Sequence, residues 1–114
     1  MVSSYVPDRG DIVWVNFNPQ KGHEQAGRRP AIVLSFKSYN QRSGLMIACP
    51  ITSKVKQYPF EVHIKEGAID GAILADQVRN LDWTARPVVF EHKATTTITL
   101  QTLTLIQLLL QAPR

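Results

Sequence analysis

The sequence predicts a mainly β protein, a small and strongly bent antiparallel sheet or barrel that ends in a C-terminal helix. Five or six short segments are rich in β-branched and aromatic residues or alternate apolar with polar side chains. Turn-forming residues separate these segments, and a leucine-rich stretch near the C terminus has helical spacing. A chain of 114 residues fits one domain over 1–114.

The first half of the chain is predicted to contain three strands, over 12–17, 30–35 and 45–51. Residues 36–41 are expected to form a short helix or turn before the third strand. That third strand is apolar throughout, which indicates burial on both faces. Pro50 near its end predicts a sheet edge or a bulge, because proline has no N–H to donate to a ladder.

The second half is predicted to contain strands over 60–64, 71–78 and 86–91, with a short helical turn over 80–84. Clean alternation supports the first of these strands. The second follows an Asp-Gly pair, which favours a tight turn.

Residues 95–111 carry conflicting signals. The β-branched run over 95–98 favours a strand, whereas leucine and isoleucine recur at helical spacing further on. We predict a helix over 99–110. It is apolar nearly all round, so both of its sides should be covered, which is easier if a second subunit packs nearby.

Positive charge is concentrated in one part of the chain. The net charge is +4, and residues 20–56 hold seven basic residues against one acidic residue, which leaves −2 for the remainder. A single basic segment indicates a polyanionic partner, nucleic acid first. A solvated basic face is the alternative reading.

The single cysteine, Cys49, cannot form an internal disulfide, and its apolar neighbours predict a buried, inert thiol. There is no apolar run near 20 residues and no basic-then-apolar N-terminal signal. We therefore expect a cytoplasmic protein without a membrane segment.

The connection between the first two strands carries most of the candidate chemistry. Glycine allows backbone to approach a ligand closely, and the guanidinium fork of arginine matches phosphate geometry. Polar pairs at two later strand ends could join this loop in one groove. The candidate ligand-binding residues are Gly22, His23, Gln25, Arg28, Ser53, Lys54, Lys56, Asp76 and Gln77.

These residue types fit metal-free cleavage of RNA, in which the ribose 2′-OH is the nucleophile. Arg29 could stabilise charge on the phosphoryl oxygens, and the Thr52 hydroxyl could donate to one of them. Glu24 is the candidate general base, with His23 as an alternative. Each has a structural alternative as well: Arg29 could pair with Glu24, and Thr52 could cap a turn. The histidines and the cysteine lack metal-ligand spacing, so neither a metal nor another cofactor is expected.

Several stretches resemble the MazF/PemK/Kid-type toxins of bacterial toxin–antitoxin pairs, and the MazF branch in particular. The likeness extends from about Tyr5 to Arg86. Its most specific parts are the long Gly-x-Glu-Gln-x-Gly-x-Arg-Pro loop that ends at Pro30 and the later Pro-x-Thr that ends at Thr52.

The resemblance implies an SH3-like antiparallel β-barrel that forms a homodimer. It implies sequence-specific, metal-free cleavage of single-stranded RNA, which leaves 2′,3′-cyclic phosphate and 5′-hydroxyl ends. It also implies a MazE-like antitoxin whose disordered tail wraps the dimer. The family's essential arginine and threonine fall on Arg29 and Thr52, and its loop glutamate falls on Glu24. Leu74 stands where one branch carries an arginine two residues before Asp76, so that Arg–Asp pair is not available and more of the catalysis is assigned to Arg29. Asp76 stays a third candidate for the general base beside Glu24 and His23.

RNA sequence is read mainly on unpaired bases, by stacking and edge hydrogen bonds. The plausible readers are Phe17, Tyr39, Asn40, Gln77 and the loop over 54–58. By family analogy the target is an ACA-like triplet. Two alternatives to the ribonuclease remain: a non-catalytic SH3-like module that holds nucleic acid or a partner chain, and a toxin of related fold that acts on DNA gyrase.

Overall fold

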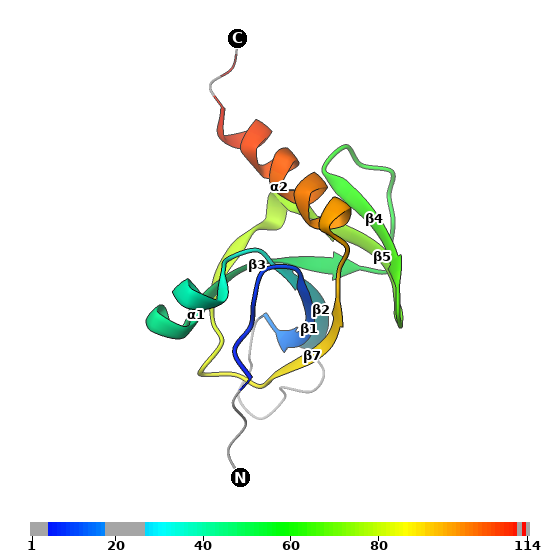
Figure 1. Ribbon diagram of the computed structural model, residues 1–114. Coiled ribbons are helices and arrows are strands. Elements are labelled where there is room, and N and C mark those ends of the chain that lie inside the picture. Colours follow the sequence, from blue (N-terminus) through cyan, green and yellow to red (C-terminus); the bar gives the residue numbers. More distant parts are fainter. Residues whose placement is uncertain (1–4, 18–26, 112, 114) are drawn as a thin grey trace.

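The computed structural model describes residues 5–17, 27–111 and 113, and within these ranges the chain is mainly β (Figure 1). The elements in chain order are β1 (Asp11–Asn16), β2 (Arg28–Val33), α1 (Lys37–Ser43), β3 (Leu45–Thr52), β4 (Glu61–Glu66), β5 (Ile69–Leu74), the 3₁₀ turn η2 (Ala75–Gln77), β6 (Arg79–Asp82), β7 (Val88–Lys93) and α2 (Thr96–Leu110).

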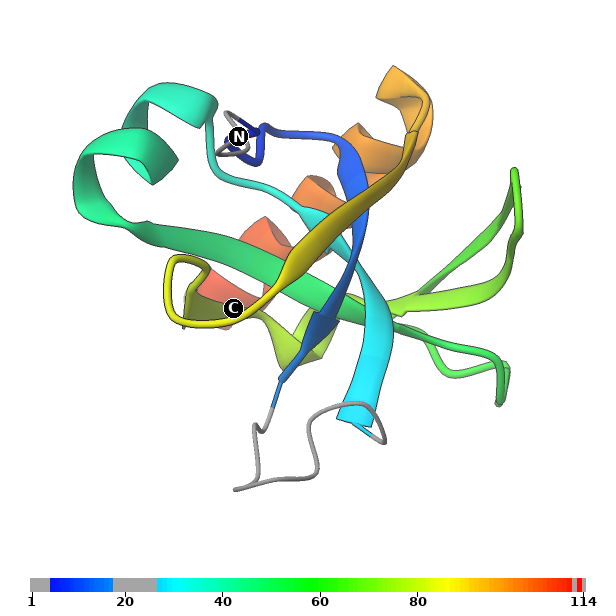
Figure 2. The same ribbon diagram turned by 90° about the horizontal axis from the view of Figure 1, so that it is seen from below.

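All the strand pairs are antiparallel, and β3 is the centre of the sheet. The strands follow the order β4-β5-β3-β2-β1-β7, and β6 pairs with β3 beside this path. The sheet curls on itself, with the β4–β5 hairpin projecting at one end and α1 lying at the other (Figures 1 and 2). This architecture confirms the predicted bent antiparallel sheet with a C-terminal helix.

Pro50, predicted to mark a sheet edge or a bulge, lies in a strand that is internal to the sheet but is itself paired on the β2 side alone. β3 pairs with β2 on one side, and on the other side its residues 45–48 pair with β6 and Ile51 and Thr52 pair with β5. Pro50 lies between the β6 and β5 ladders, where a missing N–H donor costs least. β3 is therefore a strand shared by two parts of the sheet.

The alternation of β1 divides the apolar interior into two clusters. Val13, Val15 and Phe17 share one face, as predicted, and pack in the cluster that includes Met46. Ile12 on the other face belongs to the cluster beneath α2. Each face of β1 therefore has its own core.

Helix α2 begins three residues earlier than predicted, so the β-branched run is helical. Thr95 is its N-cap, and the Thr95 side chain accepts a hydrogen bond from the backbone N–H of Ile98 (3.3 Å). The buried Thr99 and Thr102 hydroxyls donate to carbonyls one turn back. Capping and burial therefore outweigh the strand preference of β-branched residues.

In the described chain, α2 is covered on one side only. Its partly buried residues on the core side are Ile98, Leu103, Leu105 and Ile106. Exposed leucines include Leu100, Leu108, Leu109 and Leu110.

No helix of the described part of the chain is long and apolar enough to cross a membrane.

Two boundaries between 69 and 84 differ from the prediction. The strand expected over 71–78 ends at Leu74, and η2 follows it. The helical turn expected over 80–84 is wrong, because Arg79–Asp82 forms β6 against the first half of β3. Only after this strand does a turn form, when Asp82 accepts from the N–H groups of Thr84 and Ala85.

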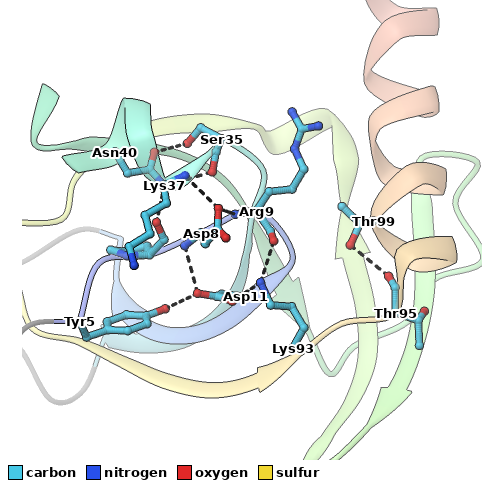
Figure 3. Close-up of polar contacts among 11 residues, drawn as sticks. Tyr5, Asp8, Arg9, Asp11, Ser35, Lys37, Asn40, Lys93, Thr95 and Thr99 are labelled. Atoms are coloured by element: carbon cyan, nitrogen blue, oxygen red, sulfur yellow. Dashed lines mark hydrogen bonds and ion pairs between the residues drawn. The ribbon is translucent and has the colours of Figure 1, made fainter. Parts of the chain in front are cut away.

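The N-terminal turn is held by Asp11 (Figure 3). Its carboxylate accepts from the Tyr5 hydroxyl (2.7 Å), accepts from the Asp8 N–H (3.0 Å) and pairs with Lys93 (2.6 Å). Burial, and then the bond to Asp11, raise the pKa of the Tyr5 hydroxyl far above its ordinary range. These contacts fix the lead-in segment against β1 and β7.

Candidate functional site

The strand register brings Arg29 and Thr52 toward each other. The β2–β3 ladder pairs Ala31 with Pro50, Ile32 with Cys49 and Val33 with Ala48. Continued by two places, the same register sets Arg29 opposite Thr52, and directly opposed residues on antiparallel strands share a face. The ladder itself stops at Ala31, and the residues beyond it on each strand line a pocket.

We call this hollow the arginine pocket. Its volume is about 360 Å³, at the small end of the range for ligand sites, about 300–1,000 Å³. It lies between the start of β2, the end of β3 and the turn between β4 and β5. The lining residues are Trp14, Arg28, Arg29, Pro30, Ile51, Thr52, Ser53, Lys54, Ala68, Ile69 and Asp70.

The Thr52 side chain is oriented by its own turn. Its Oγ1 accepts a hydrogen bond from the backbone N–H of Lys54 (3.1 Å). The turn-capping role is therefore real, and it does not compete with ligand binding, because a hydroxyl that accepts one bond keeps its proton to donate. An anion in the pocket could accept a hydrogen bond from the Thr52 hydroxyl and be stabilised by the positive charges of the two arginines.

Aromatic rings border the arginines. The guanidinium carbon of Arg29 lies 5.9 Å from the centre of the Phe17 ring, and that of Arg79 lies 5.6 Å from the same ring. Trp14 lines the pocket opposite Pro30 in the β1–β2 register and donates from Nε1 to Glu91 (3.0 Å). Trp14 thus has a pocket role and a core role at once.

A second hollow of about 360 Å³ adjoins the first. We call it the tyrosine pocket, and it shares Thr52 and Lys54 with the arginine pocket. Its lining residues are Thr52, Lys54, Lys56, Tyr58, Glu61, Leu74, Asp76 and Gln77. All the candidate site residues within the described ranges line one of these two pockets.

Four candidate residues, Gly22, His23, Glu24 and Gln25, lie outside the described residues. The choice of general base among Glu24, His23 and Asp76 stays a prediction. Asp76 lines the tyrosine pocket and not the arginine pocket.

Three of the expected base readers have other roles. Asn40 is fully buried, which contradicts its assignment as a reader. Its Nδ2 donates to the carbonyls of Pro7 (2.8 Å) and Ser35 (3.0 Å), so it ties α1 to the N-terminal segment (Figure 3). Tyr39 accepts from the Asn80 side chain (3.2 Å) and lines neither pocket. Phe17 is 4% exposed and supports the arginines from beneath.

Sequence reasoning missed three residues that shape the site. Asp70 lines the arginine pocket from the start of β5. Glu61 holds the loop over 56–58 through backbone N–H groups. Arg86 donates to the carbonyls of Asn16 (2.7 Å) and Phe17 (3.2 Å) at the end of β1. No local pattern reveals such contacts, because each joins segments distant in sequence or depends on a loop conformation.

The described residues contain no group of three or more histidine, cysteine or carboxylate side chains placed to hold a metal ion. Cys49 is buried, as predicted, and burial together with the charge of Asp76 raises the pKa of its thiol to about 12. A thiol in this state is a poor nucleophile at neutral pH.

A curled antiparallel sheet with two adjoining pockets, one rich in arginine and hydroxyl groups and one built around an aromatic ring, is typical of a protein that binds single-stranded nucleic acid. Residues 8–112 match the family model described as PemK-like, MazF-like toxin of type II toxin-antitoxin system. The chain belongs to this family of toxins.

Named relatives agree with the family match. The chain is 54% identical over 86 residues to the endoribonuclease toxin MazF of Escherichia coli K12, which covers 75% of this chain and 78% of the relative. The crystal structure of MazF from Deinococcus radiodurans superposes with a TM-score of 0.84 at 47% identity, covering 94% and 98% of the two chains. A MazE-MazF crystal structure from the same organism has a TM-score of 0.84 at 40% identity, covering 96% and 100%.

Proposed function

We propose that this chain is a toxin endoribonuclease that cleaves single-stranded RNA at specific sequences without a metal ion, and that a cognate antitoxin neutralises it. Relatives named as endoribonucleases support the activity. The observation that carries the proposal is the convergence of Arg28 and Arg29 with Thr52 and Ser53 in one pocket.

The arginine pocket supplies what cleavage by an internal nucleophile needs. The ribose 2′-oxygen attacks phosphorus and forms a new P–O bond while the bond to the 5′-oxygen breaks. Arg29 stabilises the negative charge that grows on the phosphoryl oxygens, and the Thr52 hydroxyl donates to one of them. The products are a 2′,3′-cyclic phosphate and a 5′-hydroxyl.

Two proton transfers complete the reaction. Glu24, which precedes β2 in the sequence, is assigned as the base that accepts the 2′-OH proton, and His23 is its alternative. The leaving 5′-oxygen takes a proton from water, and the protonated base later returns its proton to water, so that the protons balance. Arg29 holds its own proton too tightly to act as a true acid, so its contribution is electrostatic.

The remaining RNA contacts follow from the pocket linings. Arg28, Ser53 and Lys54 would bind the phosphate backbone around the scissile bond, and Lys56 would extend this basic path. Gly22 and Gln25, which precede β2 in the sequence, would also contact the RNA. Asp76 and Gln77 line the tyrosine pocket and would contact an adjacent base.

The proposed partners are a MazE-like antitoxin and a second copy of the chain. A structural neighbour was crystallised as a MazE-MazF complex. An acidic antitoxin tail would complement the basic segment over 20–56, and a homodimer would cover exposed leucines of α2. We place the protein in the cytoplasm, where mRNA is accessible.

The deciding experiment is incubation of the purified protein with a long single-stranded RNA in EDTA. Discrete fragments are expected whose 5′ ends accept phosphate directly from a kinase and whose 3′ ends carry cyclic phosphate. Intact RNA with retained affinity would indicate a binding module instead. Inhibited supercoiling without RNA cleavage would indicate a toxin that acts on gyrase.

A further inference from the structure

Tyr58 is held in place although its side chain is 46% exposed. Its hydroxyl donates to Asp76 Oδ2 (2.8 Å), its backbone N–H donates to Glu61 Oε1 (3.3 Å), and its ring lies 5.9 Å from that of Phe60 at 57°. Ordering an exposed side chain costs conformational entropy. The Tyr58 ring is therefore already ordered in a position where a flat ligand can stack on it.

The loop that carries Tyr58 is organised by one buried carboxylate. The Glu61 side chain is 2% exposed and accepts from the N–H groups of Lys56 and Tyr58. Gln57 between them adopts a left-handed conformation, with φ of 60°. The acceptors of Glu61 are therefore occupied by the loop, and Asp76 is the carboxylate of this pocket that can face a ligand.

Asp76 keeps one carboxylate oxygen available. Oδ2 accepts from Tyr58, and among the described residues Oδ1 accepts no hydrogen bond. The hydrogen bond to Asp76 raises the pKa of Tyr58, so the hydroxyl stays protonated as a donor. Gln77 beside it supplies both a donor and an acceptor.

We infer that the tyrosine pocket binds one unpaired base next to the scissile phosphate, with the base stacked on Tyr58 and its exocyclic amino group bound by Asp76. The inference rests on the proposed ribonuclease function and assigns to Asp76 base selection, not proton transfer. Thr52 and Lys54 line both pockets, so a nucleotide here is continuous with a phosphate in the arginine pocket.

The hydrogen-bonding pattern of this pocket selects among the bases. Adenine presents an amino donor beside the acceptor N1, and cytosine presents an amino donor beside the acceptor N3. A carboxylate oxygen and the N–H of Gln77 match that pair. Uracil presents the acceptor O4 beside the donor N3–H, which places a carbonyl oxygen against the Asp76 carboxylate. Adenine or cytosine is therefore favoured over uracil.

The test uses two pools of random single-stranded oligonucleotides. An RNA pool reports cleavage through sequencing of the fragment ends. A 2′-fluoro pool, which lacks the 2′-OH nucleophile, reports binding through sequencing of the retained fraction. One position is expected to favour adenine or cytosine over uracil by about tenfold or more in both pools, since a well-formed base contact is worth about 1–3 kcal/mol.

Two variants separate the roles of Tyr58 and Asp76. Asp76→Asn is expected to lose the preference at that one position, with cleavage reduced on RNA that carries adenine or cytosine there and little changed on RNA that carries uracil there. Tyr58→Phe keeps the ring but removes the bond that orients Asp76, and should weaken the preference. Tyr5→Phe is the matched control, because Tyr5 donates to Asp11 at 2.7 Å away from both pockets.

The outcomes are distinct. Equal loss of turnover on every sequence in Asp76→Asn, with binding preference intact, would overturn the inference and make Asp76 part of the chemistry. A base preference of Asp76→Asn that equals the parent's in both pools would also overturn the inference. If the parent protein binds the 2′-fluoro pool with the expected preference but cleaves no RNA, the proposed ribonuclease function fails while the base pocket stands.

Discussion

Gly71 lies directly against the backbone of Thr52. A Cβ at position 71 would overlap the Thr52 carbonyl oxygen and would lie 3.0 Å from its carbonyl carbon and 3.3 Å from Ser53 Cα. The absence of a side chain on β5 therefore lets the end of β3 reach the position in which its hydroxyl lines the arginine pocket. Gly71, which lines neither pocket, thus sets the position of Thr52, which lines both.

The substitution Gly71→Ala should push the end of β3 away from β5. Overpacking of this kind costs about 1–3 kcal/mol of unfolding free energy, and cleavage should fall further than stability explains because Thr52 moves. Urea denaturation and single-turnover cleavage measure the two effects. Gly44→Ala is the control: its φ of 74° makes alanine strained at the C-cap of α1, so stability should drop while cleavage by folded protein is retained.

Arg29→Ala should abolish cleavage and leave the protein folded. Removal of one charge-stabilising donor typically costs about 10²–10³ in rate, and the side chain lies at the pocket rim at the start of β2. Arg42→Ala removes the same charge from the exposed last turn of α1 and should change the rate little. Near-normal turnover of Arg29→Ala would place the chemistry elsewhere.

Thr52 allows a test of its hydroxyl alone. Thr52→Ser keeps the Oγ and should retain most activity, whereas Thr52→Val keeps the shape and should lose about 1–3 kcal/mol of transition-state stabilisation, since the phosphoryl oxygen and the Lys54 N–H both lose a partner. Single-turnover rates with saturating enzyme measure the difference. Equal rates for the two variants would remove the hydroxyl from the mechanism.

Glu61 should make the loop over 56–58 sensitive to acid. Burial of the carboxylate acts to raise the pKa of Glu61, but the N–H groups of Lys56, Tyr58 and Gln57 outweigh it and hold the pKa below the ordinary 4.5. Because the folded-state pKa is lowered, the stabilising contribution is complete above pH 4.5 and is lost as the pH falls through the lower folded value. Amide exchange of Tyr58 followed from pH 6 to 3 checks this, and Glu61→Gln should remove that pH dependence.

Asn40→Ala should lower stability without changing base preference. Asn40 is fully buried and bonds to Pro7, Ser35 and the Ser35 hydroxyl, so its loss leaves buried polar groups unpaired at about 1–3 kcal/mol each. The measurements are urea denaturation and sequencing of the cleaved ends. A changed target sequence in the folded variant would restore Asn40 as a reader.

Local patterns were sufficient for β1, β2, β3 and α1. Alternation along β1 predicts which residues share a core face, and Gly44 in a left-handed conformation ends α1. β6 was missed because Asn80 and its neighbours become a strand only through pairing with β3. The start of α2 was missed because capping by Thr95 and burial of Thr99 decide it, and neither is visible as periodicity.

The candidate site likewise contains residues that the sequence identifies and contacts that only the fold decides. Arg29 and Thr52 could be named from residue type and family resemblance, but their approach depends on the β2–β3 register, which sequence does not specify. The Tyr58–Asp76 bond joins residues 18 positions apart and leaves no local signal. The sequence therefore predicts which groups are present better than it predicts which of them meet.

The two pockets overlap at Thr52 and Lys54 alone. In the proposed mechanism, bond breaking and base selection thus use separate pockets that meet at the end of β3. Under that mechanism, substitutions in the segment over 55–60 and at Asp76 and Gln77 would change the target sequence while the arginine pocket and its cleavage step are retained.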